Sequence, residues 1–462
     1  MDRTPGPSGG KGAQRLSWGT VRPEFPFPQR KVFYGWWMVA GGFFIQTVLG
    51  LFMFHAFGFY VERLEEEFNW SKTTFSLAFA MTRIESGVLG PIQGWAIDRF
   101  GPRIMIRLGI ASTGIGFVLF SFVDSVTTFF LTYFLIAIGA SMAGFVTLVV
   151  AVVNWFERKR SLALGLMSAG FSVGGLLVFL VVLAMDQYGW RATSLVAGVV
   201  IFVVGQIVAT FIHHRPEDRG ETIDGEPVPE APPRQGLGSG PVVIPASEDF
   251  STGEALRSPT FWFISIGHGA AVLIIGAFMV HLVLHLENLG YSAFTSSLIV
   301  LMMTAFQLVG QIGGGFLGDR LNKRVMLAFC MVGHVVALLL VTYAVGFWMI
   351  ALFAIVNGIA WGTRGPMQQA LRADYFGRRD FGKIMGFSSL IVMFGMMSGP
   401  IIAGAMADAF GDYERGFTVL AVIAGLGTIF FAIAGPPNRP TGPIWYKRWP
   451  LVRRLTFQER LA

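Results

Sequence analysis

Twelve long apolar stretches, separated by short polar segments, dominate the hydrophobicity pattern of the 462-residue chain. An α-helix needs about 20 mostly apolar residues to cross the hydrocarbon core of a bilayer, and the stretches reach that length. The pattern therefore predicts an all-α integral membrane protein with transmembrane helices at residues 33–60, 73–97, 104–123, 126–153, 161–185, 190–212, 260–285, 293–317, 325–345, 347–370, 383–407 and 416–435.

Composition supports this class. Hydrophobic residues make up 53% of the chain and charged residues 14%, whereas soluble domains average about 25% charged residues. A soluble chain of this length would be expected to divide into domains with polar surfaces. The single cysteine, Cys330, excludes an intramolecular disulfide framework.

Lysines and arginines indicate the orientation. With the N-terminus inside, 29 of the 35 lie on the inner side and only four on the outer side. A cytoplasmic excess of Lys and Arg fixes the orientation of membrane helices, so we expect both termini to be cytoplasmic, in a plasma or inner membrane. The basic residues are scattered over loop ends, so we expect no nucleic-acid partner. The four on the outer side are Arg63, Lys72, Arg191 and Arg415.

Three segments lie outside the spans. Residues 1–32 are Gly/Pro-rich and basic without an apolar signal-peptide core, which predicts a disordered cytoplasmic tail. Residues 213–258 hold seven prolines and nine acidic residues, which predicts a cytoplasmic linker with few contacts; capping-box spacing from Ser251 predicts a short helix within it. The basic cytoplasmic tail 437–462 fits a helix on an anionic leaflet and a disordered segment equally well.

Polar landmarks recur at a nearly constant distance. Three such pairs in register predict two pseudo-symmetric six-helix halves, residues 33–212 and 259–436, a parallel repeat of the kind found in transporters. The pairs are Gly94-x-x-x-Asp98-Arg99 with Gly315-x-x-x-Asp319-Arg320, Asn154-Trp155-Phe156 with Asp374-Tyr375-Phe376, and Asp186-x-x-Gly189 with Asp408-x-x-Gly411, at offsets of 221, 220 and 222 residues.

This arrangement, with G-x-x-x-D-R-x-G-x-R ending at Arg103 between the second and third spans, resembles the major facilitator superfamily over about residues 33–436. The segments NWFERKRSLALGLMSAG and DYFGRRDFGKIMGF, together with GWR at 189–191, resemble the monocarboxylate-porter and oxalate–formate antiporter branch. The resemblance implies the major facilitator fold and alternating access to a central cavity lined mainly by spans 1, 4, 7 and 10.

The resemblance also gives the repeated motif a gating role, in which its Asp faces the N-terminus of a helix in the other half. Free N–H groups and the helix dipole favour an anion there. Asp98 would meet the chain near residues 382–386, and Asp319 near residues 161–164. The alternative is that these charges only enforce topology. The implied gating residues are Gly94, Asp98, Arg99, Arg103, Gly315, Asp319 and Arg320, with Arg99 and Arg103 holding the loop against acidic groups such as Glu157.

Two charged residues lie inside the second span. Arg83 is 15 residues from Asp98, or about 22 Å of helix, which places it near mid-bilayer. An arginine there costs at least about 2.5–3.5 kcal/mol, so it is expected to face protein or water and to have a partner. Arg83 shares a helical face with the glycines of the motif, which directs it into the gap between the halves. Glu85 points elsewhere and is a candidate for proton coupling, because burial disfavours a charged carboxylate; a hydrogen-bonding role is equally open.

The tenth span carries a polar stripe of Asn357, Trp361, Arg364 and Gln368, at helical spacings of 0, 4, 7 and 11. Arg83 and Arg364 would then be the only fixed positive charges within the spans, one from each half. Arginine binds carboxylates bidentately, so these charges predict an organic anion as substrate. Both arginines could instead be structural, bonded to helix ends or carbonyls.

Two histidines on cavity-lining spans, His55 and His268, complete the substrate-binding candidates, although a lone histidine is more often packed than functional. The branch's own charged positions in spans 1, 8 and 11 cannot be transferred, because the interiors of those spans contain no Lys, Arg or Asp here. The anion hypothesis therefore depends on Arg83 and Arg364.

We expect a monomeric secondary transporter of a monocarboxylate or related anion in a lipid bilayer, without cofactor or metal. The chain has no H-E-x-x-H, G-x-S-x-G or Cys/His cluster that would indicate an enzyme. Two alternatives stay open. One is an efflux-type transporter of a neutral or cationic molecule with structural arginines. The other is a non-transporting sensor on the same scaffold.

Overall fold

The computed structural model describes residues 32–226 and 249–438. The predictions for the two terminal tails fall almost entirely outside these ranges and stay predictions. Within the second span, the side chain of Arg83 is also outside the description, as are those of Lys72, Ser76 and Phe79.

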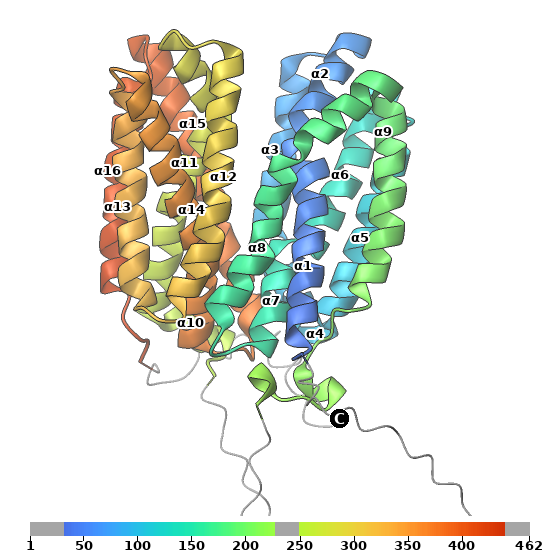
Figure 1. Cartoon of the computed structure of the whole chain (residues 1–462), viewed down its shortest axis with the longest axis vertical. Helices are drawn as coiled ribbons and strands as arrows, with labels where there is room; N and C mark the ends of the chain where they lie inside the picture. The colour runs from blue at the N-terminus through green and yellow to red at the C-terminus, as the bar shows by residue number, and fades with distance from the viewer. Residues whose placement is uncertain (1–31, 227–248, 439–462) are drawn as a thin grey trace, which may run out of the picture. The chain divides into compact units, whose positions relative to one another are not determined.

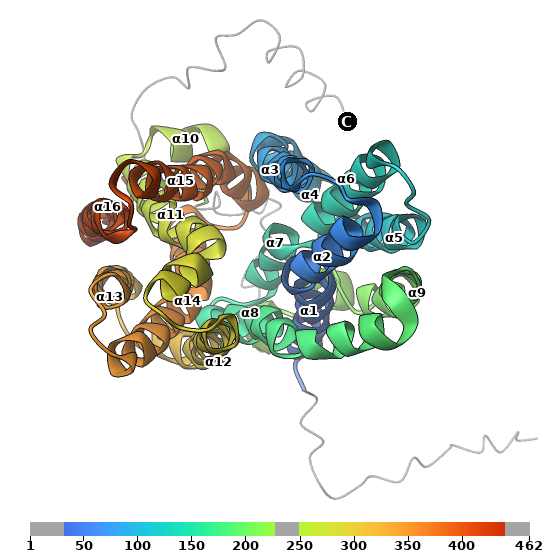
Figure 2. The ribbon, with the colours of Figure 1, turned by 90° about the horizontal axis from the view of Figure 1, so that it is seen from above.

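The described residues form helices and no strands, and the spanning helices are arranged as two bundles (Figures 1 and 2). Short 3-10 turns, η2 (Pro216–Arg219) and η3 (Ile223–Gly225), follow the first bundle. The first bundle contains α1 (Gly35–Leu49), the π-helical turn η1 (Gly50–His55), α2 (Phe57–Phe68), α3 (Lys72–Val88), α4 (Gly90–Phe100), α5 (Pro102–Phe120), α6 (Val126–Ala143), α7 (Phe145–Trp155), α8 (Arg160–Leu176) and α9 (Val178–Ala209).

The second bundle is preceded by α10 (Thr252–Arg257), which begins with the predicted capping box of Ser251 and Glu254. The spanning helices of this bundle are α11 (Pro259–Asn288), α12 (Ala293–Gly318), α13 (Lys323–Thr342), α14 (Phe347–Phe376), α15 (Phe381–Phe410) and α16 (Glu414–Ile433).

Among the described residues, ten helical stretches are long and apolar enough to cross a membrane. One of them, Arg160–Ala209, has 50 residues, or about 75 Å of helix, against a hydrocarbon core of about 30 Å. It reverses at Gly189, whose φ of 80° is not helical, so it supplies two crossings. The pair α3–α4 supplies one more, which gives the twelve predicted crossings.

The predicted repeat is visible in the backbone at these reversals. Gly189 has φ 80° and its counterpart Gly411 has φ 82°. Glycine adopts such values without the steric cost that a Cβ imposes. Both bundles therefore have a glycine with positive φ at this landmark, although ψ is 159° at Gly189 and 0° at Gly411.

Spanning helices of the first bundle are interrupted near their middle. α1 continues through the π-helical turn η1 into α2, α3 gives way to α4 at Leu89, and α6 gives way to α7 at Gly144, where ψ is −158°. The counterparts α11, α12 and α14 are single helices of 30, 26 and 30 residues. α14 stays continuous even though it contains Pro366.

Each bundle buries its own apolar core. The bundles approach each other at the end that holds Asp98 and Asp319, which we call the basic end, and diverge toward the other end (Figure 1). Part of the second bundle packs into the first core at the basic end, through Ala370, Ala373, Phe381 and Met385.

The described ends of the segment between the bundles make more contacts than its composition predicted. The Asp224 carboxylate accepts the N–H of Arg158 at 2.9 Å, in the loop after α7. The Asp249 carboxylate accepts the N–H of Arg379 at 3.1 Å, in the matching loop after α14. The expectation of few contacts was wrong for these ends, because short acidic side chains satisfy exposed loop N–H groups.

Candidate functional site

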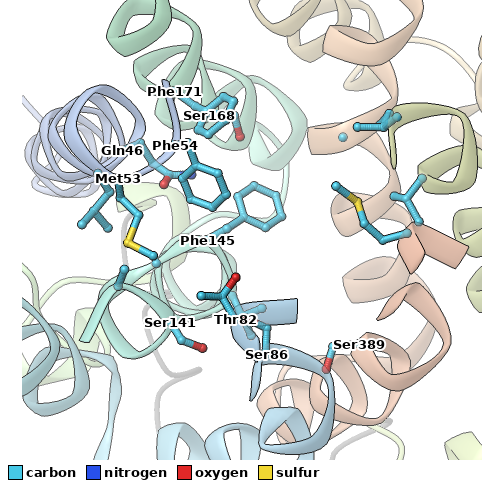
Figure 3. A pocket seen from close by; sticks show the side chains of 18 of the residues that line it. Gln46, Met53, Phe54, Thr82, Ser86, Ser141, Phe145, Ser168, Phe171 and Ser389 are labelled. Atoms are coloured by element: carbon cyan, nitrogen blue, oxygen red, sulfur yellow. The ribbon is translucent and has the colours of Figure 1, made fainter. Parts of the chain in front are cut away.

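A cavity of about 410 Å³ lies between the two bundles. This volume falls in the range of about 300–1,000 Å³ typical of small-molecule sites. Polar side chains from several helices point into it, with aromatic rings between them (Figure 3). The labelled polar residues are Gln46 on α1, Thr82 and Ser86 on α3, Ser141 on α6, Ser168 on α8 and, across the cavity, Ser389 on α15.

Arg364 supplies the charge on the wall formed by the second bundle. It lines the cavity and is only 2% exposed. One terminal nitrogen donates to Gln368 Oε1 at 3.1 Å, and Nε is buried without a hydrogen-bond partner. Within the described ranges, no carboxylate oxygen lies within 4.0 Å of this guanidinium. A buried cation with a neutral partner and an unused donor is suited to bind an anion.

A second buried arginine, Arg372, was missed by the sequence analysis. The apolar stretch was expected to stop short of it, but α14 continues past it and the residue is 1% exposed. Its guanidinium donates to Ser388 Oγ at 2.6 Å and to Gln369 Oε1 at 2.9 Å. The expectation that Arg83 and Arg364 are the only positive charges within the spans was therefore wrong.

Two histidines flank this wall. His268 lines the cavity from α11, and its Nδ1 is buried without a partner. His334 on α13, which the sequence analysis did not consider, is fully buried with Nδ1 2.8 Å from Oδ1 of Asn357. No signal in the apolar pattern of that span set His334 apart.

The wall formed by the first bundle carries Glu85. This residue is 7% exposed, lines the cavity, and accepts a hydrogen bond from Ser86 Oγ at 3.1 Å. The His55 ring packs against the ring of Phe171 at a centroid distance of 4.9 Å, and His55 is not among the residues that line the cavity.

The break before α7 brings main-chain donors to the same cavity. Gly144, Phe145 and Val146 line it, and none of the described side chains caps the N-terminus of α7. The first N–H groups of a helix lack intrahelical acceptors and carry the positive end of its dipole. The hydrophobicity pattern predicts one continuous span here, at residues 126–153, and gives no sign of the break.

The structure therefore brings together part of the predicted substrate site. Trp361, Arg364 and His268 line the cavity, whereas Asn357 and Gln368 are fully buried behind it. The polar stripe of α14 runs along the boundary between the cavity and the face that packs on α12 and α13. Some of its residues therefore line the cavity and others lie in the packing contacts. The roles of these residues in binding stay predictions.

At the basic end, the predicted contacts of the two motif aspartates are confirmed. The Asp98 carboxylate accepts the N–H groups of Gly382 and Lys383, each at 2.9 Å. The Asp319 carboxylate accepts the N–H groups of Ser161 at 2.7 Å and Leu162 at 3.0 Å. Each carboxylate thus caps the first turn of a helix in the opposite bundle, which links the bundles directly.

The motif arginines behave differently from the expectation. Arg103 Nε is buried without a partner, and neither Arg99 nor Arg103 pairs with Glu157 among the described side chains. Arg320 lies over the Phe316 ring, 3.4 Å from its centroid. Arginines outside the motif do bridge the bundles: Arg160 donates to Asp374 at 2.5 Å, and Arg378 donates to the Asn154 carbonyl at 3.2 Å.

Asp380, immediately before α15, adds a tethered carboxylate next to Asp98. Burial alone would raise the pKa of Asp380, but the N–H of Thr252 at 2.9 Å and the ammonium of Lys383 at 3.2 Å outweigh it, so the pKa is lowered. This carboxylate stays charged and ties α10 to the start of α15.

Comparison with known proteins identifies the family. The model of the Major Facilitator Superfamily matches residues 42–312 and 264–449. The chain therefore belongs to the major facilitator superfamily, and its relatives are transporters and not enzymes.

Three relatives show which members it resembles. It is 27% identical to the MFS transporter asaE of Aspergillus flavus, over 75% of this chain and 74% of that protein. It is 25% identical to monocarboxylate transporter 13 of Bos taurus, over 88% and 92%, and 25% identical to the oxalate:formate antiporter of Oxalobacter formigenes, over 81% and 85%. The predicted likeness to the monocarboxylate and oxalate–formate branch is confirmed.

Solved structures agree on the fold. The crystal structure of the transporter FucP in its outward conformation superposes with a TM-score of 0.67 at 14% sequence identity, covering 87% of this chain and 98% of that one. The predicted all-α major facilitator fold is therefore confirmed.

Proposed function

We propose that this multi-pass membrane protein is a secondary active transporter that moves a small organic anion, a monocarboxylate or related carboxylate, by alternating access. The observation that carries the proposal is Arg364, a cavity-lining guanidinium without a carboxylate partner among the described residues. A buried charge is costly unless a counter-charge accompanies it, and the planar guanidinium matches a carboxylate. The uncapped N-terminus of α7 on the opposite wall also favours an anion.

The names of two relatives support the same class of substrate. Monocarboxylate transporter 13 and the oxalate:formate antiporter are both named for carboxylates. They match 88% and 81% of this chain, which supports a shared site.

The contacts at the basic end support alternating access. The Lys and Arg distribution predicts that this end is cytoplasmic. The contacts of Asp98, Asp319 and Arg160 hold it closed, so the described state would be open to the outside. Transport would then require these contacts to break while the opposite end closes.

Binding of carboxylates by purified protein tests the proposal. A ligand that binds only the folded state raises the melting temperature, so small carboxylates can be screened by thermal shift. Losing a charge-assisted hydrogen bond costs about 1.5–3 kcal/mol, so Arg364→Gln should weaken binding by about 10- to 150-fold. Arg364→Lys keeps the charge without the planar fork and should be intermediate. Unchanged carboxylate binding in a well-folded Arg364→Gln variant would make Arg364 structural and remove the observation on which the choice of an anion depends.

Glu85 is the candidate for proton coupling in this proposal. In proteoliposomes, Glu85→Gln should abolish uptake driven by a pH gradient but preserve exchange of substrate across the membrane. If pH-driven uptake survives in this variant, Glu85 has a hydrogen-bonding role only and another group couples transport to protons.

A further inference from the structure

Two adjacent glutamines on α14 are each paired with an arginine of the same helix. Arg364 donates to Gln368 Oε1 at 3.1 Å, and Arg372 donates to Gln369 Oε1 at 2.9 Å. All four residues are at most 2% exposed. A guanidinium has only donors, so the amide atom that faces it must be the oxygen. Chemistry therefore fixes the orientation of both amides.

Because each amide oxygen faces a guanidinium, the Nε2 group of each amide is directed away from that guanidinium and is the donor offered to other groups. Gln369 lines the cavity, and within the described residues its Nε2 has no acceptor. Gln368 Nε2 and Arg364 Nε are buried nearby without partners. At this position on α14, the wall of the second bundle therefore presents hydrogen-bond donors to a ligand.

We infer that Arg372, which does not line the cavity, sets the ligand preference of the site by holding the Gln369 amide with its N–H groups toward the ligand. Arg372 is thus a positioning residue, and the ligand group that fits the resulting donors is a carboxylate. This inference rests on the proposed function and deepens it. It makes the preference for anions a property of a network on α14 in addition to the charge of Arg364.

Arg372 is itself anchored in the core of the second bundle. The hydroxyl of Ser388 on α15 accepts a hydrogen bond from the second terminal nitrogen of Arg372 at 2.6 Å. The same hydroxyl donates to Ser265 on α11 at 3.0 Å. Three helices therefore fix the guanidinium, and the guanidinium fixes Gln369. A network satisfied on several sides holds one geometry, which explains how a residue outside the cavity can control its polarity.

Aromatic rings in the cavity suggest suitable test ligands. Phe54, Phe145, Phe171 and Trp361 line it, so a planar ring carrying one polar group should fit. Benzoate, benzamide and benzamidinium have nearly the same shape but are an anion, a neutral amide and a cation. Their relative affinities measure the polarity of the wall, separately from its size.

The experiment compares these three compounds on wild-type protein and on Gln369→Glu and Gln369→Met, using calorimetry in detergent. Wild type should bind benzoate best and benzamidinium worst. Gln369→Glu keeps an oxygen for Arg372 but replaces the N–H groups by a second oxygen. The affinity for benzoate should therefore fall at least about tenfold, and the affinity for benzamidinium should rise. Gln369→Met should lower the affinity for benzoate without raising the affinity for benzamidinium.

Melting temperatures without ligand test the contact itself. Gln369→Glu retains an acceptor for Arg372 and should be at least as stable as wild type, while Gln369→Met should be less stable. Arg372→Lys, another donor-only residue, should preserve the preference for benzoate over benzamidinium, and Arg372→Met should reduce it. If Arg372→Met does not fold, the Gln369 variants still decide the question.

The outcomes separate the two claims. The proposed anion function is refuted if wild type prefers benzamidinium. It is also refuted if wild type binds the three compounds equally, or binds none of them, and other carboxylates fail in the thermal-shift screen. Wild type that prefers benzoate, with Gln369→Glu equal to it in both binding and preference, leaves the function standing and overturns the inference. A Gln369→Glu variant as unstable as Gln369→Met would also overturn it, since the oxygen would then not face Arg372.

Discussion

The two bundles are repeats of one arrangement of helices, yet they line the cavity with different chemical groups. Asn154 and Asp374 are matched at an offset of 220 residues, and the same offset places Gly144 opposite Arg364. Gly144 breaks its helix and exposes the N-terminus of α7 to the cavity, whereas Arg364 lies in an unbroken helix and reaches the cavity with its side chain. Main-chain groups in one bundle thus stand where a guanidinium stands in the other.

This difference suggests that the two bundles respond differently to a ligand. Interrupted helices have unsatisfied main-chain groups and can bend at their breaks, while the second bundle is held together by buried polar contacts around Arg372 and His334. We expect the first bundle to adapt its shape around a ligand and the second to provide a fixed, charged surface. The predictions below test this contrast.

The largest effect should come from overpacking the second bundle. A Cβ at Gly399 would overlap the backbone carbonyl of Leu273, where α15 crosses α11. Backbone on both sides cannot move without shifting a helix, so Gly399→Ala should destabilise the protein by about 1–3 kcal/mol or more. Thermal unfolding in detergent, or loss of monodisperse protein, measures this.

A matched glycine between the bundles should respond differently. A Cβ at Gly94 would overlap the backbone carbonyl of Gly382 across the basic end. Because whole bundles can separate there, Gly94→Ala should open the basic end at a smaller cost in stability. Spin labels at the exposed positions Ile104 and Val325, with the buried Cys330 unlabelled, should then move apart. Equal destabilisation by both alanines, without separation, would contradict the picture of movable bundles.

A smaller loss is expected when a partner of a buried charge is removed. Ser388 is 1% exposed and accepts a hydrogen bond from Arg372. Ser388→Ala leaves a buried cation short of one acceptor, which should cost about 1–3 kcal/mol. Chemical or thermal unfolding of the purified protein provides the measurement.

The control is a serine in the first bundle. Ser168 is 4% exposed, but its hydroxyl has no hydrogen-bond partner within the described part of the chain. Ser168→Ala should therefore change stability by no more than about 0.5 kcal/mol. If Ser168→Ala were as destabilising as Ser388→Ala, the first bundle would contain a polar network of equal importance and the contrast between the bundles would fail.

The sequence predicted the features that repeat or that depend on length. Apolar runs located the crossings, and the landmark pairs led to the contacts of Asp98 and Asp319 across the bundles. Such features follow from the bilayer thickness and from helix ends, which are the same in every copy of the plan. The span boundaries were less certain, and Arg372 was missed because the polar residues around it concealed that α14 continues.

The parts that failed depend on tertiary packing. Spacing placed Asn357 and Arg364 on one face of a helix, but only the structure shows that this face is divided between the cavity and the contact with α13. The break at Gly144 was equally invisible, because glycine is frequent in membrane helices and most of the glycines here lie in continuous ones. Neither property is encoded in a local pattern.

Local opening should differ between the bundles by a moderate factor. In hydrogen exchange, amides of residues 144–148 should exchange about tenfold or more faster than those of residues 364–368, or about 1.4 kcal/mol in opening free energy. Benzoate should protect the first segment more than the second, because the N–H groups of Phe145, Val146 and Thr147 belong to the first turn of α7 and lack intrahelical acceptors. Equal exchange in both segments would show that the break at Gly144 does not loosen the wall.

The smallest effect concerns the two motif aspartates, which are the most symmetrical part of the molecule. Asp98 caps the start of α15 and Asp319 caps the start of α8, and a carboxylate at a helix N-terminus contributes about 0.3–1 kcal/mol, or up to about 2 when partly buried. Asp98→Asn and Asp319→Asn should each shift the protein toward opening at the basic end by a similar amount, seen as increased separation of labels at Ile104 and Val325. Equilibrium binding of benzoate should change little, since neither residue lines the cavity. A large loss of binding in either variant would place that aspartate in the ligand site. A shift in only one would mean that the repeated motif has diverged in role, just as Gly144 and Arg364 have.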